Sequence, residues 1–340
     1  MKLIKNNSFF YKNNFSKNIK QKKSPIKCKK GNIFTGLTTL IVFSFILTSI
    51  ILLNFTISSN NINTDASNSN SFNYLIEDYN RNIPISAKEV MKNLSEDTIK
   101  NHVPCYNSAN MIKDQLQKVL NENNEKYKKN NGVIIESEVL SVYNGKDPYH
   151  INVKTLIHGQ KGEMEYNNVV ESEISIEGLK DPLPFLMCKD YPTLVENGTK
   201  ISYNDALSHY LAINNLLNPD VYENATASLI IKRCPIDPYE QHGHEFCMKN
   251  CIENGYFHES ADGSCYLCRL EGKGGCYHYG LEVLILPHKV STLGDTSISG
   301  SDHVIFQDHY PGNSTSIYQA DGLYEILILD DSHKAKYGMV

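Results

Sequence analysis

A single apolar stretch, residues 33–53, limits what this chain can fold into more than any other feature. Its sequence, IFTGLTTLIVFSFILTSIILL, has 21 residues and no charged side chain. As a helix with a rise of about 1.5 Å per residue it reaches roughly 32 Å, enough to cross a hydrocarbon core of about 30 Å. We therefore predict a membrane-spanning helix that separates an N-terminal tail from a much larger C-terminal part.

Charge is distributed very unevenly on the two sides of this stretch. All ten charged residues within 1–30 are lysines, whereas all 38 acidic residues follow Asn63. Because lysine-rich flanks stay on the cytoplasmic side, we expect a single-pass protein of the cell membrane with a cytoplasmic N-terminus and an extracellular head. Removing the ten tail lysines from the 33 basic residues leaves 23 against 38 acidic residues. Such a negative head excludes nucleic acid as its partner.

Two other roles besides simple anchoring are open to this N-terminal region. Aromatic residues interleave with the tail lysines, as at Phe9, Phe10, Tyr11 and Phe15, which also suits an arm that contacts anionic lipid or nucleic acid. A cleaved secretory signal has a similar outline, but its apolar core is normally about 7 to 15 residues long. The longer run here favours an uncleaved anchor in contact with the lipid bilayer.

Changes in composition divide the chain into five parts. We predict a basic cytoplasmic tail, a transmembrane helix, a flexible polar stalk, a helical pair with a β-meander, and a cysteine-rich α+β region, at residues 1–30, 31–57, 58–73, 74–180 and 181–340. The stalk sequence, SSNNINTDASNSNSFN, has no periodicity and too little apolar surface to bury.

Hydrophobic periodicity predicts two amphipathic helices at the start of the head. Pro84 precedes the capping-box pattern of residues 86–89, which predicts one helix start. A second helix is expected from about Ser108, and Gly132 stands where a left-handed C-cap would end it.

The remaining patterns indicate strands, and the fold class is therefore α+β with an antiparallel, β-rich ectodomain. Asn144-Gly145 separates two alternating runs, which predicts a hairpin, and residues 163–176 supply a third strand. Further buried strands are expected at the apolar runs 281–286, 304–306 and 323–329.

Cysteine is concentrated beyond the span, and its even number there favours disulfides in an exported domain. Cys28, in the tail, is the exception. The candidate disulfide residues are Cys105, Cys188, Cys234, Cys247, Cys251, Cys265, Cys268 and Cys276. Their connectivity does not follow from the sequence, and we expect no cofactor on this interpretation.

The alternative interpretation of the same segment is a zinc site. Two close cysteine pairs, with x3 and x2 spacing, are separated by thirteen residues and flanked by histidines, and tetrahedral zinc accepts such ligands. The ligand candidates are Cys247, Cys251, Cys265, Cys268, His242 and His244. An anaerobic surrounding would favour zinc over disulfides, because thiols there are not oxidised.

No motif specifies a reaction, so we expect a protein that is not an enzyme. The sequence HGHE at residues 242–245 lacks the His-Glu-x-x-His spacing of zinc hydrolases. The glycine-rich residues 272–275 lack the phosphate-binding spacing and predict a turn before Cys276. The acidic–histidine pairs at Asp302-His303, at Asp308-His309 and at residues 330–333 could join a divalent metal site, although such pairs are typical of solvated loops.

Residues 29–35, KKGNIFT, directly before the apolar stretch, resemble the start of archaeal type IV prepilins and related pilin-like surface proteins. The runs IEGLKDPL, CRLEGKGGC and SDHVIF are similar to sequences in pilin-like proteins of methanogenic archaea. The resemblance implies a cut after Gly31 that leaves Asn32 as the new N-terminus, and a helix able to pack with other pilin-like subunits. Gly36 stands where such prepilins commonly carry a glutamate, which favours a minor pilin or an anchored protein over a major filament subunit.

Two functional hypotheses follow from these patterns. The favoured one is a pilin-like surface protein with a disulfide-stabilised head, whose non-enzymatic role is to bind a partner or the cell envelope. The other is a membrane-anchored metal-binding protein or metalloenzyme that uses residues 242–278.

Overall fold

The computed structural model describes residues 32–216, 218–236, 242, 245–288, 298–307, 314–319 and 326–338. The chain is α+β and its sheets are antiparallel, as predicted. It divides into two compact units, Met1–Ala66 and Ser67–Val340, which we take in turn.

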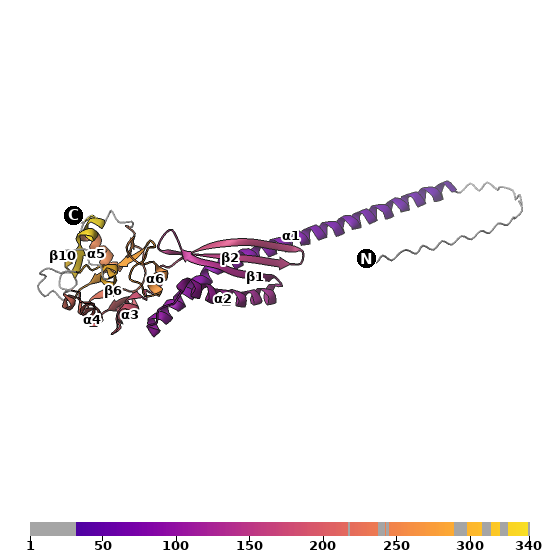
Figure 1. Ribbon diagram of the computed structural model, residues 1–340. Coiled ribbons are helices and arrows are strands. Elements are labelled where there is room, and N and C mark those ends of the chain that lie inside the picture. The colour runs from indigo at the N-terminus through magenta and orange to yellow at the C-terminus, as the bar shows by residue number, and fades with distance from the viewer. Residues whose placement is uncertain are drawn as a thin grey trace, which may run out of the picture. The chain divides into compact units, whose positions relative to one another are not determined.

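The first unit contains the predicted membrane-spanning stretch as part of helix α1, Asn32–Asn101 (Figure 1). Gly36–Thr56 is long and apolar enough to cross a membrane, and none of this span is buried. The expectation of a long apolar helix is therefore confirmed. The lysine-rich tail and Gly31 lie outside the described residues.

The stalk prediction is corrected by the structure, because residues 58–73 lie within α1. Once a helix is nucleated, each added residue costs little, so a polar segment between two apolar helical segments can propagate the helix. The expected helix start after Pro84 is likewise absent, since α1 runs through this proline. Ile83 and Ala87, on either side of it, are both fully buried. Their packing offsets the backbone hydrogen bond that proline cannot donate.

In the second unit, α1 and α2 (Ser108–Asn131) cover a three-stranded sheet. The buried face of α1 recurs every three or four residues, at Phe72, Ile76, Tyr79, Ile83, Ala87, Val90, Met91 and Leu94. The boundaries predicted for α2 are confirmed, with the side chain of Asn107 as N-cap and Gly132 as a left-handed C-cap.

The sheet is an antiparallel meander in the order β1-β2-β3, formed by Ile134–Asn144, His150–Lys161 and Met164–Ser175. The predicted hairpin and third strand are thereby confirmed. The turn is longer than two residues because Gly145 N–H bonds to the carbonyl of His150. A Cβ at Gly145 would lie 2.8 Å from that same carbonyl oxygen, so glycine is needed there.

The cysteine-rich part that follows consists of short helices and strands around two further apolar clusters. The helices are α3 Leu183–Met187, η1 Glu196–Gly198, α4 Ala206–Ile213, η2 Pro219–Tyr222, α5 Glu245–Asn254, α6 Tyr266–Leu270, α7 Asp302–Phe306 and α8 Asp331–Lys336. The strands are β4 Thr193–Val195, β5 Lys200–Ser202, β6 Thr226–Ser228, β7 Phe257–Ser260, β8 Gly280–Val283, β9 Ile285–Leu286, β10 Ser314–Gln319 and β11 Ile326–Asp330.

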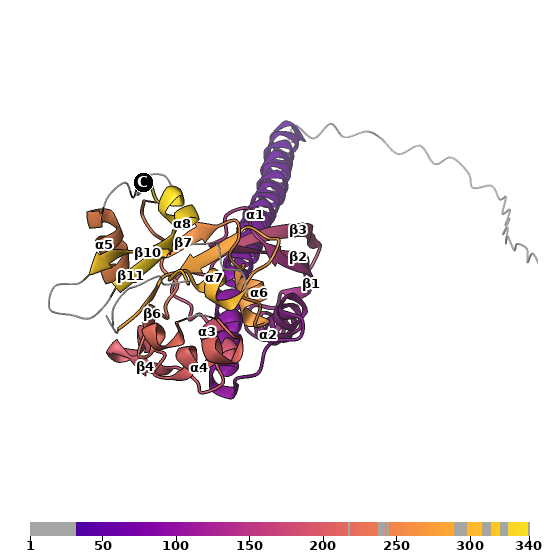
Figure 2. The ribbon, with the colours of Figure 1, turned by 60° about the vertical axis from the view of Figure 1, so that its left-hand side comes forward.

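These strands form three small antiparallel sheets, β4-β5-β6-β9, β7-β8 and β10-β11. Figure 2 shows α5, α8 and the β10–β11 hairpin on one side of this part, with α3, α4 and β4 on another. The run predicted as a strand at 281–286 corresponds to β8 and β9. Of the run predicted at 323–329, residues 326–329 lie in β11, and residues 323–325 lie outside the described part of the chain. The run 304–306 was predicted wrongly, because it lies in helix α7.

Candidate metal centres

No disulfide joins any two of the eight cysteines that the structure describes. The disulfides predicted for them are therefore absent from the described part of the chain. Five of the eight instead meet histidines in two clusters, whose ligand atoms lie within 4.8 Å of one another. We call them centre 1 (Cys234, His242, Cys251 and His258) and centre 2 (Cys265, Cys268, Cys276 and His278).

Centre 1 is assembled by a tight connection between helix α5 and strand β7. Cys251 lies in the last turn of α5 and His258 is the second residue of β7. Gly255 joins the two elements with a positive φ of 65°, and a Cβ there would lie 2.7 Å from the hydroxyl of Ser228. Glycine thus ends the helix in a left-handed conformation and lets the chain turn back into the strand.

The separations within centre 1 are those of a tetrahedral zinc site. Cys234 Sγ lies 3.5 Å from Cys251 Sγ and 3.4 Å from His242 Nε2. Bonds of about 2.3 Å to sulfur and about 2.0 Å to nitrogen give tetrahedral edges of roughly 3.8 Å for S–S and roughly 3.5 Å for S–N. A disulfide would instead require about 2.05 Å between the sulfurs.

His258 provides an independent indication that centre 1 holds a ligand. The residue is fully buried, and neither of its ring nitrogens has a hydrogen-bond partner within the described residues. An unsatisfied buried polar group costs about 1–3 kcal/mol. Metal coordination by one of these nitrogens would offset that cost, so the residues present fit a zinc ion.

Centre 2 is built around the short helix α6 and the glycine-rich loop that follows it. Cys265 is the N-cap of α6 and Cys268 lies within it, while Cys276 and His278 come from the loop. His278 Nδ1 lies 3.5 Å from Cys265 Sγ and 3.7 Å from Cys268 Sγ, again close to tetrahedral edges. The backbone N–H of Cys265 donates to Cys276 Sγ at 3.3 Å, which favours the thiolate form.

Electrostatics in both centres favour a mixture of thiol and thiolate. The hydrogen bond with Cys251 is the main cause that lowers the pKa of Cys234 to about 2, against the opposing effect of burial. In centre 2, hydrogen bonds from Cys265 and Cys268 hold the pKa of Cys276 far below its usual value. Hydrogen bonds with Cys265 and Cys276 raise the pKa of Cys268. Crowded sulfurs of this kind suit a cation that neutralises them together.

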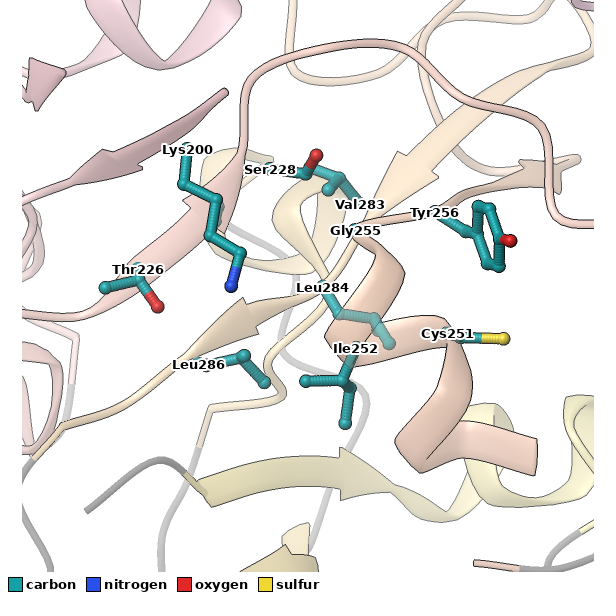
Figure 3. Close-up of a pocket in the computed structure, with 11 residues that line it drawn as sticks. Lys200, Thr226, Ser228, Cys251, Ile252, Gly255, Tyr256, Val283, Leu284 and Leu286 are labelled. Carbon is teal, nitrogen blue, oxygen red and sulfur yellow. The ribbon is translucent and has the colours of Figure 1, made fainter. Parts of the chain in front are cut away.

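The two centres differ in their access to solvent. All four residues of centre 1 are buried, whereas Cys276 and His278 are half-buried and line a cleft of about 690 Å³ together with Tyr143, Lys273 and Tyr277. A much smaller pocket of about 20 Å³ lies beside α5, but Figure 3 shows Cys251 pointing its sulfur away from Lys200 across that pocket. The pocket therefore shares Cys251 with centre 1, but the sulfur of this residue is not directed towards Lys200.

The single zinc site considered from the sequence is divided by the structure into two. Strand β7 and the turn after it separate the two cysteine pairs, so Cys251 and Cys265 belong to different centres. Cys247, although one helical turn before Cys251, joins neither centre, and His244 lies outside the described residues. Cys105 and Cys188 are buried elsewhere, where burial raises the pKa of the Cys188 thiol to about 12.

The ligand set predicted from the sequence did not include four members of the two centres: Cys234, His258, Cys276 and His278. The spacing Cys-x2-Cys-x7-Cys-x-His over residues 265–278 would have identified centre 2 as a local unit. Centre 1 has a weaker signal, because Cys234 reaches it through a backbone bond to the Phe257 carbonyl 23 residues away.

Comparison with known protein families, with curated proteins and with solved structures finds no match to this chain. The interpretation of both centres therefore rests on their own geometry.

Proposed function

We propose that this protein is a membrane-anchored, pilin-like surface protein whose head is cross-linked by two zinc ions, one in each centre, and whose role is non-enzymatic. The observation that carries this proposal is the convergence of four sulfur and nitrogen ligands at near-tetrahedral separations in two places. It adopts the zinc interpretation of the cysteine-rich segment in place of disulfides.

A structural role for the zinc follows from the number of ligands. Four protein ligands complete the tetrahedron, while catalytic zinc keeps one position open for water or substrate. Because an unfolded chain has no such site, the free energy of metal binding adds directly to folding. Short helices and strands such as α6 and β7 bury little apolar surface by themselves, so this contribution matters most in the cysteine-rich part.

The anchoring part of the proposal is supported by the exposed apolar span Gly36–Thr56. A helix with exposed leucine, isoleucine and phenylalanine on all sides needs lipid or similar helices around it. We infer a cytoplasmic N-terminus and an extracellular head from the lysine distribution, and the bilayer, the cell envelope or other pilin-like subunits as partners.

The experiment that tests the zinc proposal uses the full chain in detergent, purified without added metal or oxidant. Metal analysis is expected to find zinc, and cobalt substitution should give the intense thiolate-to-cobalt absorption of cysteine ligation. Cys251→Ala and Cys276→Ala should each lose about one thiolate-bound metal ion, because each removes a ligand from one centre. The matched control is Cys188→Ala, a buried cysteine outside both centres, which should keep both ions.

The competing disulfide account makes the opposite prediction in the same preparation. Alkylation of the unfolded, metal-free protein without reductant should label every cysteine if zinc holds the thiols. The proposal would be overturned if mass spectrometry found alkylated cysteines only after reduction and if the cobalt-substituted protein showed no thiolate absorption.

A further inference from the structure

A third group of potential metal ligands lies apart from the two cysteine centres. It consists of Glu282 on β8, His303 on α7 and His333 on α8, all of them buried. These residues come from segments that the sequence separates by 21 and 30 positions. Two of the acidic–histidine pairs noted in the sequence thus meet inside the head instead of lying in solvated loops.

The three side chains converge on one point. His303 Nε2 lies 2.9 Å from Glu282 Oε2 and 3.0 Å from His333 Nε2, and His333 Nε2 lies 3.4 Å from the same carboxylate oxygen. Ligands placed about 2.0–2.2 Å from a metal have tetrahedral edges of roughly 3.3–3.6 Å, so this triangle needs to expand by only a few tenths of an ångström to hold an ion.

The surroundings orient one of the imidazoles for this role. His333 Nδ1 lies 2.6 Å from Asp330 Oδ2, and Asp330 is also the N-cap of α8 through the N–H of His333. With its Nδ1 proton directed to Asp330, a neutral His333 presents a lone pair at Nε2 towards Glu282 and His303. A carboxylate that fixes a histidine in this way is the usual support of a metal-binding imidazole.

The alternative is a metal-free ion network. Lys336 Nζ lies 2.9 Å from Glu282 Oε2, and the hydroxyl of Tyr337 donates to the other oxygen of Glu282. These groups partly neutralise the buried carboxylate. They leave two imidazole nitrogens facing each other at 3.0 Å, so either a proton or a shared cation must lie between their lone pairs.

We propose that Glu282, His303 and His333 form a third divalent metal site, thiolate-free and suited to zinc, with at least one coordination position left for water or a ligand group. Two imidazoles and one carboxylate are the donor set of open zinc sites, in contrast to the closed centres 1 and 2. This site stands independently of the proposed function, because it shares no ligand with either cysteine centre.

The test is a cobalt(II) titration of the full chain in detergent, with metal analysis of the zinc form alongside. In addition to the thiolate-bound ions of centres 1 and 2, the wild type should bind one cobalt ion in the third site. This ion should give weak visible bands without thiolate absorption. His303→Gln should lose this ion and keep the thiolate–cobalt absorption, which also reports that the cysteine centres remain folded. The control His209→Gln changes an exposed histidine on α4 and should keep all ions.

A second variant keeps the site testable if His303→Gln disturbs folding. Asp330→Asn preserves an N-cap of similar quality but removes the charge that supports His333. Loss of such a supporting carboxylate should weaken cobalt binding by about 10–100-fold.

The outcomes are separable from those of the proposed function. The third site is overturned if the wild type binds no metal ion outside the cysteine centres. It is also overturned if His303→Gln leaves the metal content unchanged. Both results hold whatever centres 1 and 2 bind. Missing thiolate absorption with the thiolate-free ion retained would overturn only the two zinc cross-links.

Discussion

Arg269 donates two hydrogen bonds to Asp181, at 2.9 and 2.5 Å, and neither side chain is exposed to solvent. The same guanidinium reaches Asp302 at 2.6 Å. Asp181 follows the meander, Arg269 lies on α6 beside centre 2, and Asp302 precedes His303 of the third site. One buried cation therefore connects three segments that are distant in the sequence.

We expect Arg269→Met to lower the free energy of unfolding by about 3–5 kcal/mol, because it leaves the buried carboxylates of Asp181 and Asp302 without the cation that neutralises them. Thermal and denaturant unfolding of the full chain in detergent, followed by circular dichroism, measures this change. The control Arg81→Met breaks an exposed pair with Glu77 and should change stability by about 1 kcal/mol or less. Equal effects of the two substitutions would refute the importance of the buried network.

A second prediction concerns pH and Asp147, in the turn between β1 and β2. Burial raises the pKa of Asp147, but hydrogen bonds from the Tyr149 N–H and from Arg233 outweigh it and leave this pKa below 3.8. A carboxylate whose pKa is lowered by folding stabilises the protein at pH values above the pKa it has in the unfolded chain. This stabilisation is lost as the pH falls through the pKa it has in the folded protein.

Asp147→Asn should therefore be less stable than the wild type at pH 6, by at most about 1 kcal/mol since the pair is partly exposed. The difference should shrink below about pH 4. If centres 1 and 2 hold zinc as proposed, acid would release it from both proteins alike, so this effect should cancel in the comparison. Asp97→Asn, which removes a carboxylate from an exposed face of α1, is the matched control. A difference that stays constant between pH 6 and pH 3 would contradict the assignment.

Membrane orientation is a third prediction, derived from the ten lysines before the span. Protease added to intact cells should remove the head, whereas residues 1–30, where retained, should be cut only after the membrane is permeabilised. Immunoblots with antibodies to each part measure this. Digestion of the tail with protection of the head would reverse the orientation.

A fourth prediction concerns processing at the sequence KKGN. If the prepilin resemblance extends to maturation, the native chain begins at Asn32, since a cut after Gly31 removes every tail lysine and frees the helix to leave the bilayer sideways. Mass spectrometry of the N-terminal peptide from native membranes should show this, and Gly31→Leu should block it. Gly36→Ala is the matched control, because no atom lies within 4 Å of the Cβ position there. A mature protein that starts at Met1 or Lys2 would remove support for the pilin-like assignment.

The parts of the fold that could be predicted are those specified by local chemistry. The caps of α2 at Asn107 and Gly132 and the turn at Gly145 each depend on a few neighbouring residues, and the structure has them where the sequence indicates. Residues 304–306 were assigned to a strand because three apolar residues have no measurable period. Their helical conformation follows from tertiary packing, with Phe306 against Tyr210 on α4.

The two cysteine–histidine centres show the same limit. Cys265 and Cys268 are recognisable because a CxxC pair is local, but the sequence does not indicate that Cys234 and His258 lie together. Their meeting depends on the bridge between Arg233 and Phe257 and on the turn at Gly255. Glu282 was unremarkable in sequence, since nothing about a single glutamate in an apolar run indicates that two histidines converge on it.

Tyr337 lies between two of the three sites. Its ring is 5.1 Å from that of His242 and 5.2 Å from that of His258 in centre 1, while its hydroxyl donates to Glu282 of the third site. An ion that repositions the histidines would shift this ring, and an ion that draws away charge from Glu282 would weaken the hydroxyl bond. If an ion in centre 1 changes the affinity of the third site for its ion by some factor, an ion in the third site must change the affinity of centre 1 by the same factor. Tyr337→Phe keeps the ring and removes the hydroxyl, so it separates cooperative loading of the two sites from independent loading.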